Sequence, residues 1–380
     1  MNLEIIITIC IYVVIAAVIA LAITMIVMHV RANRKHPHHK CSKHTANPIM
    51  SPRPHNEWEA NGTFNPAAVA DDEGKVHLLY RTIGIDGLSR IGHATSKNGT
   101  KIDSRSTFPV YHPEPDCGIR LDDTICTNEP KEFNTTVYTS GGGWGGSEDP
   151  RAVLIDDTVY MTYTAFEGWN SVRIALTSIP LKNMKSNKWT WKRTQIISPK
   201  GQVNKNWVLF PERINGKFAI LHAVSPDVKI EYADSLDNFR LSNGDKTIKS
   251  ISPKGGRKDF WDNNMRGAGP PPIKTDLGWL LLYHSMDKND PDKYKVGAMI
   301  LDSNNPEKVI YRSPKPIMEP EFHYENDGKP GVVYASGAVI KDGELYVYYG
   351  GGDKHVCVAK TPLDDLLNWM KKYGGIKSRK

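Results

Sequence analysis

The first pattern along the chain is a long hydrophobic segment near its N-terminus. Residues 5–28 contain no charged side chain, and a helix of that length, rising about 1.5 Å per residue, could cross the hydrocarbon core of a bilayer. A cleaved signal peptide would have a shorter apolar stretch, a basic start and a small-residue cleavage site, none of which is visible. The sequence therefore predicts a single-pass transmembrane anchor over residues 1–30, with the membrane as a partner through residues 5–28.

A basic segment follows the hydrophobic one. Residues 31–54 are rich in His, Lys, Arg and Pro and show no apolar periodicity, so they predict a flexible linker. By the positive-inside rule, this charge bias places the rest of the chain in the cytosol. The Asn-x-Thr triplets at Asn61, Asn98 and Asn134 would mark a lumenal face if glycosylated. Since about three such triplets are expected by chance, they do not decide the question.

Beyond the linker, short hydrophobic runs recur at spacings of roughly 60 to 85 residues. Each run is rich in β-branched and aromatic residues and follows a turn signal, which predicts a strand after a tight hairpin. A second apolar strand, opened by a Pro or Gly turn, lies about ten residues upstream of each run. The five runs begin at Val76, Val159, Phe218, Trp279 and Leu345, and the upstream openings lie at Asn65, Asp149, Phe210, Pro271 and Ser336.

Five copies of one hairpin unit predict radial repetition, because such repetition hides the edges of short sheets. The predicted fold class is therefore all-β, a five-bladed β-propeller over residues 55–366 preceded by the single N-terminal transmembrane helix. Residues 367–380 are expected to be a polar C-terminal tail. Two stacked β-sandwich domains with coincidental hairpins are the alternative.

Composition narrows the function classes. Charged residues make up 24% and hydrophobic residues 39% of the chain, so it can bury a sizeable core. The net charge of +7 is concentrated in residues 31–43 and 371–380 without interleaved aromatic residues, and no nucleic-acid partner is predicted. Only Cys117 and Cys126 could form a short-loop disulfide, with free thiols as the other possibility, and no zinc-type cysteine pairing is present. No metal is required by any motif.

One acidic segment stands directly after a glycine-rich stretch, at a predicted blade opening. It contains Glu148, Asp149 and Arg151. A carboxylic acid in a crowded, partly dry site can have its pKa raised by desolvation, which suits a general acid acting on a glycosidic oxygen. Taken alone, the segment could equally be a turn with a local ion pair.

Basic and aromatic residues lie near other predicted strand ends. Lys205, His222, Arg81 and Arg151 could supply the several charge-assisted donors that a phosphate dianion needs, although scattered basic residues are also typical of a solvated face. Residues 260–287 combine aromatic rings with carboxylates, a pattern typical of sugar binding. In that stretch the best candidates follow a hairpin strand, whereas the tryptophans could be core residues. These candidates are His284 and Asp287.

These motifs, in this order, resemble family 130 of the glycoside hydrolases, the β-mannoside phosphorylases and related mannosidases. The resemblance covers nearly all of residues 58–360. It is carried by Phe64-Asn65-Pro66, Leu79-Tyr80-Arg81, Glu148-Asp149-Pro150-Arg151, Asn204-Lys205, Leu209-Phe-Pro-Glu, Gly269-Pro-Pro-Pro-Ile, Gly278-Trp-Leu-Leu-Leu-Tyr-His, Pro320-Glu321 and Tyr348-Tyr-Gly-Gly-Gly-Asp353.

The resemblance implies a five-bladed propeller and an inverting reaction on terminal β-mannosides. Asp149 would be the acid, acting through a hydroxyl of the mannose ring, while inorganic phosphate attacks the anomeric carbon from the opposite face and gives α-mannose 1-phosphate. No cofactor beyond phosphate is implied. The implied phosphate ligands are Arg151, Arg173, Lys205 and His222, and the implied sugar ligands are Asn65, Arg81, Asp287, His284 and Asp353.

Two other functions stay open from the sequence. A water-using β-mannosidase could share the scaffold, and Ala223 stands after His222 where many relatives have Arg. The second open function is that of a catalytically silent propeller that is displayed on a membrane and binds glycans. The stretch from Tyr111 to Gly146 is longer than expected between the first two repeats and predicts a loop near the active-site mouth that alters which acceptor sugars fit.

Overall fold

The computed structural model describes residues 10–25, 37–112, 132–169, 171–237, 239 and 256–376. The chain divides into two compact units, Met1–His39 and Lys40–Lys380. In the first unit, residues 10–25 are helical. Within the described ranges, no helix combines the length and the hydropathy needed to cross a membrane. The predicted transmembrane anchor and its single-pass topology are thus wrong, and the predicted cytosolic placement, which was derived from that topology, no longer has a basis.

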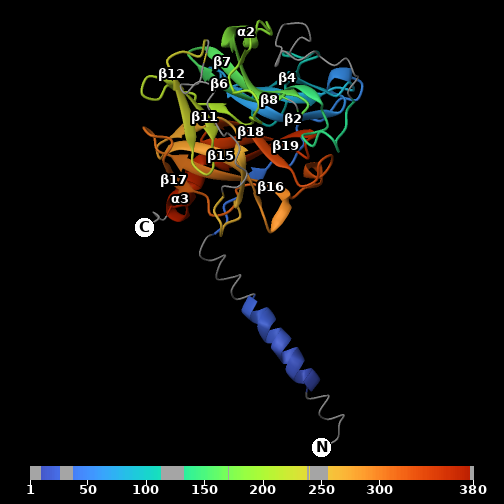
Figure 1. The fold of residues 1–380 in the computed structure, drawn as a ribbon, viewed down its shortest axis with the longest axis vertical. Helices are drawn as coiled ribbons and strands as arrows, with labels where there is room; N and C mark the ends of the chain where they lie inside the picture. Colours follow the sequence, from blue (N-terminus) through green and yellow to red (C-terminus); the bar gives the residue numbers. More distant parts are fainter. Residues whose placement is uncertain are drawn as a thin grey trace, which may run out of the picture. The chain divides into compact units, whose positions relative to one another are not determined.

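The second unit consists mainly of strands (Figure 1). Its first half contains β1 (Ser42–Lys43), η1 (Glu57–Glu59), β2 (Gly62–Ala70), β3 (Val76–Ile83), β4 (Leu88–Ser96), β5 (Ser104–Arg105), β6 (Gly145–Ile155), β7 (Thr158–Glu167), β8 (Ser171–Pro180), α2 (Leu181–Lys185) and β9 (Gln195–Ile196). Its second half contains β10 (Val208–Leu209), β11 (Phe218–Ala223), β12 (Lys229–Ala233), β13 (Asn264–Ala268), β14 (Ile273–Thr275), β15 (Gly278–Asp287), β16 (Asp290–Leu301), β17 (Val309–Arg312), η2 (His323–Glu325), β18 (Val333–Lys341), β19 (Glu344–Gly351), β20 (His355–Pro362) and α3 (Leu363–Tyr373).

Each of the five predicted hydrophobic runs is a strand, namely β3, β7, β11, β15 and β19. Each pairs antiparallel with the strand before it and the strand after it. The fourth repeat differs from the pattern, because two separate strands, β13 and β14, pair with the same edge of β15. The local hairpin pattern was therefore readable from the spacing of apolar residues.

The arrangement of those hairpins differs from the prediction. The described strands form four sheets of four, three, five and eight strands, and none of these sheets closes on itself. The largest sheet joins the first two repeats, since β4 pairs with β6 in a short parallel ladder. The prediction of a five-bladed propeller with a transmembrane helix is therefore wrong. Apolar periodicity fixes hairpins, but it carries no information about which hairpins share a sheet.

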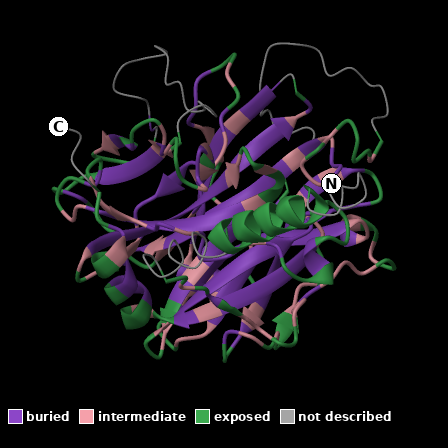
Figure 2. Cartoon of the chain, turned by 90° about the horizontal axis from the view of Figure 1, so that it is seen from below, coloured by how far each residue is buried: buried purple, intermediate pink, exposed green. Residues whose placement is uncertain are grey.

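The first and last repeats are neighbours in space. Strand β18 packs beside β2 (Figure 1), and the Ser336 hydroxyl donates a hydrogen bond to the Pro66 carbonyl over 3.1 Å. Burial follows the strands, and exposed residues gather in the connecting loops (Figure 2). As a result, β2, β6 and β18 lie in contact with one another.

The predicted flexible linker and the predicted polar tail are both partly ordered. Within the predicted linker, β1 pairs with β20, and Cys41 and Met50 are buried. Within the predicted tail, α3 continues to Tyr373 and buries Trp369 and Met370 against the sheet. The few apolar residues in these polar segments are enough to dock them, because each fully buried side chain stabilises the fold by about 1.5–3 kcal/mol. Cys117 and Cys126 lie outside the described residues.

Candidate active site

A cavity of about 300 Å³ is lined by residues from the first, second, fourth and fifth repeats and from the segments that connect the repeats. Its walls combine carboxyl, amide, basic and aromatic side chains from strands and loops far apart in sequence. The lining residues are Asn65, Thr139, Ser140, Asp149, Trp169, Val203, Lys205, Asn206, Met265, Arg266, Tyr294, Lys329, Val332, Tyr334 and Asp353.

Two β-bulges aim polar side chains into this cavity. The register of β2 shifts between Phe64 and Ala67, and that of β6 shifts between Glu148 and Arg151. Asn65 and Asp149, inside these bulges, have left-handed backbones with φ of 46° and 48°. Asn and Asp tolerate this conformation better than other non-glycine residues. Each bulge breaks the alternation of its strand and redirects one side chain, as is common beside active sites.

The two redirected side chains meet. The Asn65 amide donates to the Asp149 carboxylate over 2.7 Å. The guanidinium of Arg81, from β3, donates to the same carboxylate oxygen over 3.2 Å and to Glu148 over 2.7 Å. Lys205 donates to the other Glu148 oxygen over 3.2 Å. Asp149 is therefore held by an amide and a buried arginine, and Glu148 is fully engaged behind it.

The charge state of Asp149 differs from the prediction. Burial alone would raise the pKa of this carboxyl, but the positive charges of Arg81, Lys205 and Arg151 outweigh burial and lower the pKa to about 2. The predicted upward shift is thus wrong in direction. The sequence analysis considered burial of this carboxylate but not the contact that Arg81 makes with it.

Asp353 is the carboxyl with a raised pKa. Its backbone is also left-handed, with φ of 50°. Burial raises its pKa to about 6, with Asp149 adding to the rise while the cations of Lys329, Arg81 and Lys205 oppose it. The Lys329 ammonium lies 3.8 Å from the carboxylate. One cavity thus holds two carboxyls whose pKa values are pushed apart, the arrangement expected of groups with different proton-handling tasks.

Arg151 braces the wall of the cavity. Its guanidinium donates to the backbone carbonyls of Gly269 (2.8 Å) and Asp149 (2.6 Å), to the Tyr334 hydroxyl (2.9 Å) and to the Asn206 side chain (3.2 Å). The Tyr334 hydroxyl in turn donates to Asn206. These bonds fix the positions of Asn206 and Tyr334, which line the cavity.

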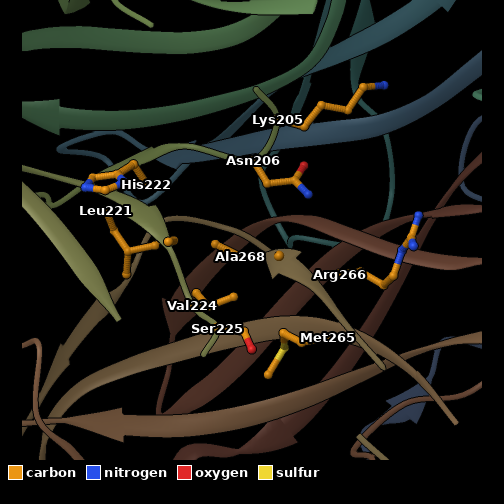
Figure 3. Close-up of a pocket in the computed structure, with 11 residues that line it drawn as sticks. Lys205, Asn206, Leu221, His222, Val224, Ser225, Met265, Arg266 and Ala268 are labelled. Carbon is orange, nitrogen blue, oxygen red and sulfur yellow. The ribbon is translucent and has the colours of Figure 1, made fainter. Parts of the chain in front are cut away.

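A second, much smaller cavity of about 20 Å³ adjoins the first and shares Lys205, Asn206, Met265 and Arg266 with it. Figure 3 shows its side chains, including His222 and Ser225. Burial lowers the pKa of His222, so its imidazole is neutral at pH 7. The two cavities therefore share two cationic side chains, Lys205 and Arg266, and the Asn206 amide.

The predicted site residues fall into three groups by position. The larger cavity is lined by Asn65, Asp149, Lys205 and Asp353, and the smaller one by Lys205 and His222. Directly behind the lining lie Arg81, Arg151 and His284, the last stacked on Tyr334 with ring centres 4.2 Å apart. Burial lowers the pKa of His284 to about 3.

Two predicted residues lie apart from both cavities. The Arg173 guanidinium donates to the Ser198 carbonyl over 3.1 Å, and the Asp287 carboxylate accepts from the Asn263 amide over 3.1 Å. Neither residue is among those that line the described cavities.

Sequence reasoning missed several lining residues, among them Arg266, Lys329, Asn206 and Tyr334. Arg266 lies at a third bulge, where β13 shifts register between Met265 and Gly267, whereas the sequence pattern placed the opening of that repeat at Pro271. Arg266 thus occupies a bulge position of the same kind as Asn65 and Asp149. Lys329 lies in a loop outside the repeat, and no pattern pointed to it.

A pair of carboxyls with separated pKa values, facing basic side chains in a polar cavity, is typical of enzymes that use a carboxyl group to transfer protons, glycosidases among them. The chain belongs to family 130 of the glycoside hydrolases: the family model, described as β-1,4-mannooligosaccharide phosphorylase, matches residues 32–372. The resemblance noted from the sequence motifs is thereby confirmed.

Curated relatives and solved structures agree with this assignment. A 1,2-β-oligomannan phosphorylase of Thermoanaerobacter sp. (strain X514) is 36% identical over 329 residues, covering 84% of this chain and 96% of its own. A β-1,2-mannobiose phosphorylase of the same organism is 36% identical over 330 residues, covering 82% and 94%. The structure of a β-1,2-mannobiose phosphorylase from Listeria innocua superposes with a TM-score of 0.63 over 87% of this chain and 99% of its own; at 23% identity this shows the fold alone.

Proposed function

We propose that the protein catalyses the inverting phosphorolysis of terminal β-mannosides, and the reverse synthesis, with α-mannose 1-phosphate as the sugar phosphate. The relatives matched over most of their length are named as phosphorylases of this kind. The observation that carries the proposal is the placement of Asp149, which faces a cavity containing Lys205 and Arg266 from the left-handed bulge of β6.

The terminal mannose is proposed to occupy the buried part of the larger cavity. Asn65, Asp149 and Asp353 offer amide and carboxyl groups there for its hydroxyls. Arg81 lies behind the residues that line the cavity, and its guanidinium is already hydrogen-bonded to Glu148 and Asp149. Its role is to hold the carboxylate in place and not to bind sugar directly.

Phosphate is proposed to bind where the two cavities adjoin. Lys205, Arg266 and the neutral His222 supply donors for its oxygens. Arg151 supports this region by fixing Asn206. We do not include Arg173 or Asp287 in the reacting centre, because their side chains are bonded away from both cavities.

The reaction then needs no second catalytic base, because phosphate is already a nucleophile. A phosphate oxygen forms the new bond to the anomeric carbon while the bond to the leaving-group oxygen breaks on the opposite face. Asp149 supplies the proton of that oxygen through a mannose hydroxyl. Bound phosphate also places negative charge beside Lys205, which offsets the cationic field and raises the pKa of Asp149 toward the range that an acid requires.

The test is to incubate the full-length protein with β-1,2-mannobiose, the linkage named for both 36% identical relatives, and with β-1,4-mannobiose. Mannose 1-phosphate should appear in phosphate buffer, and the Asp149→Asn variant should be inactive. Release of free mannose at the same rate in phosphate-free buffer would show that the protein hydrolyses β-mannosides and does not phosphorolyse them. Sugar binding without turnover, equal in the wild type and in Asp149→Asn, would indicate a silent glycan-binding protein.

A further inference from the structure

We propose that Trp169 forms the platform for the sugar on the reducing side of the scissile bond, so that it selects the acceptor in the synthetic direction. This inference rests on the proposed function and adds a specificity-determining residue to it. Trp169 follows β7 and lines the larger cavity.

The larger cavity has a buried floor and an exposed rim. On the floor, Asn65, Asp149 and Tyr334 are each at most 8% exposed. On the rim, Trp169 is 51% and Val203 is 45% exposed. If the terminal mannose reaches Asp149, the next sugar must therefore lie at the rim, because the substrate enters from the exposed side.

The indole of Trp169 is held in place although half of it faces solvent. Its N–H donates to the Val137 carbonyl over 3.1 Å. It meets Phe166 edge to face, with ring centres 5.5 Å apart and planes at 79°, and the Lys205 ammonium lies over the indole, 6.0 Å from its ring centre. A large ring fixed on several sides and open on another binds a flat apolar surface with little loss of conformational entropy.

A pyranose ring has such a surface, because one of its faces consists largely of C–H groups, whereas its hydroxyls point outward. Carbohydrate sites accordingly combine an aromatic face with a few polar groups. The rim also provides those polar groups. Lys329 donates to the Thr139 carbonyl over 2.8 Å and still has other N–H donors on its ammonium.

The loop that holds Trp169 is bonded to the catalytic carboxylate through one arginine. Ser140 belongs to the same loop as Val137, and its hydroxyl and carbonyl accept from Arg81 over 3.0 and 2.8 Å. Arg81 also donates to Asp149. The acceptor platform is thus positioned relative to the reacting bond.

The experiment measures the synthetic direction, with mannose 1-phosphate as donor and mannose as acceptor. For Trp169→Ala we expect the KM for the acceptor to rise about ten-fold, the effect of losing one aromatic stacking contact, while the KM for mannose 1-phosphate stays within about two-fold of the wild type. Trp169→Phe should lie between, since it keeps an aromatic face. Phe108→Ala is the matched control, because this phenyl ring is 76% exposed and does not line the cavity.

An unchanged acceptor KM in Trp169→Ala overturns the proposal. The proposal is also overturned if the KM for the acceptor and the KM for mannose 1-phosphate rise by the same factor in both Trp169→Ala and Trp169→Phe. That result would mean that the ring only supports the loop. If the wild type itself makes no product, the proposed function fails separately. In that case, mannobiose binding is measured by the change in tryptophan fluorescence. A fluorescence change that occurs in the wild type and is lost in Trp169→Phe supports the platform. An identical change in both proteins overturns it.

Discussion

Replacing Asp353 with Asn should stabilise the protein at neutral pH. The carboxyl has a pKa of about 6 in the folded protein, against 3.8 for an unperturbed Asp. Its folded pKa is raised, so the stability that it contributes is fully present below pH 3.8 and is lost as the pH rises through 6. Asn removes the charge and keeps a residue type that tolerates the left-handed backbone at this position.

The magnitude follows from the shift. Since one pKa unit corresponds to about 1.4 kcal/mol, ionised Asp353 lowers the free energy of unfolding by about 3 kcal/mol at pH 7 but by only about 0.5 kcal/mol at pH 4. These are upper bounds, because the Lys329 ammonium 3.8 Å away also loses its partner in the variant. Thermal unfolding should show Asp353→Asn melting higher than the wild type at pH 7, by roughly 2 °C per kcal/mol.

A control with the opposite sign is available in the same cavity. The pKa of Asp149 is lowered to about 2, so its contribution is present above pH 3.8 and lost as the pH falls toward 2. Asp149→Asn should therefore destabilise the protein at pH 7, by up to about 2 kcal/mol. The reasoning is refuted if Asp353→Asn differs from the wild type by the same amount at pH 4 and pH 7, or if both variants shift stability in the same direction at pH 7.

Three further variants test other parts of the site. Arg81→Ala removes the cation that two buried carboxylates share, and only Glu148 keeps another one, Lys205. It should cost about 3–5 kcal/mol of stability in urea denaturation; a loss under about 1 kcal/mol contradicts this. Tyr334→Phe removes the hydroxyl that bridges Arg151 and Asn206 and should cost about 1–2 kcal/mol, with an unchanged midpoint as the contrary result. Lys205→Met should raise the KM for phosphate at least ten-fold. It also removes a cation that lowers the pKa of Asp149, and because this acid must be protonated to react, the alkaline limb of the pH–rate profile should move to higher pH; a rise in mannoside KM alone would reassign Lys205 to sugar binding.

The hairpins could be read from the sequence, and their assembly could not. Apolar runs such as residues 279–284 became strands because alternation and turn residues act locally. The parallel contact between Leu88 and Gly145 joins two repeats across a long loop, and no local pattern encodes it. The N-terminal segment shows the same limit, since hydropathy alone favoured a membrane span, whereas no helix among the described residues combines the length and the hydropathy for one.

The site was predictable where a motif coincides with a strand opening. Asn65 and Asp149 were found this way, and both line the cavity. Asp287 and His284 were assigned from their position after a strand, but strand ends do not report which way a side chain points. The pKa of Asp149 depended on Arg81, 68 residues away in sequence, which only the folded structure brings to it.

The left-handed backbones at Asn65, Asp149, Asn206 and Asp353 limit how this enzyme can evolve. At such positions Asn, Asp and Gly are tolerated, whereas longer or β-branched side chains are strained. Accessible mutations can therefore exchange a carboxylate for an amide, or delete it, but cannot lengthen Asp to Glu at low cost. New substrate preferences should arise through the rim loops, where the backbone accepts many residues, while these four positions change only by exchange among Asn, Asp and Gly.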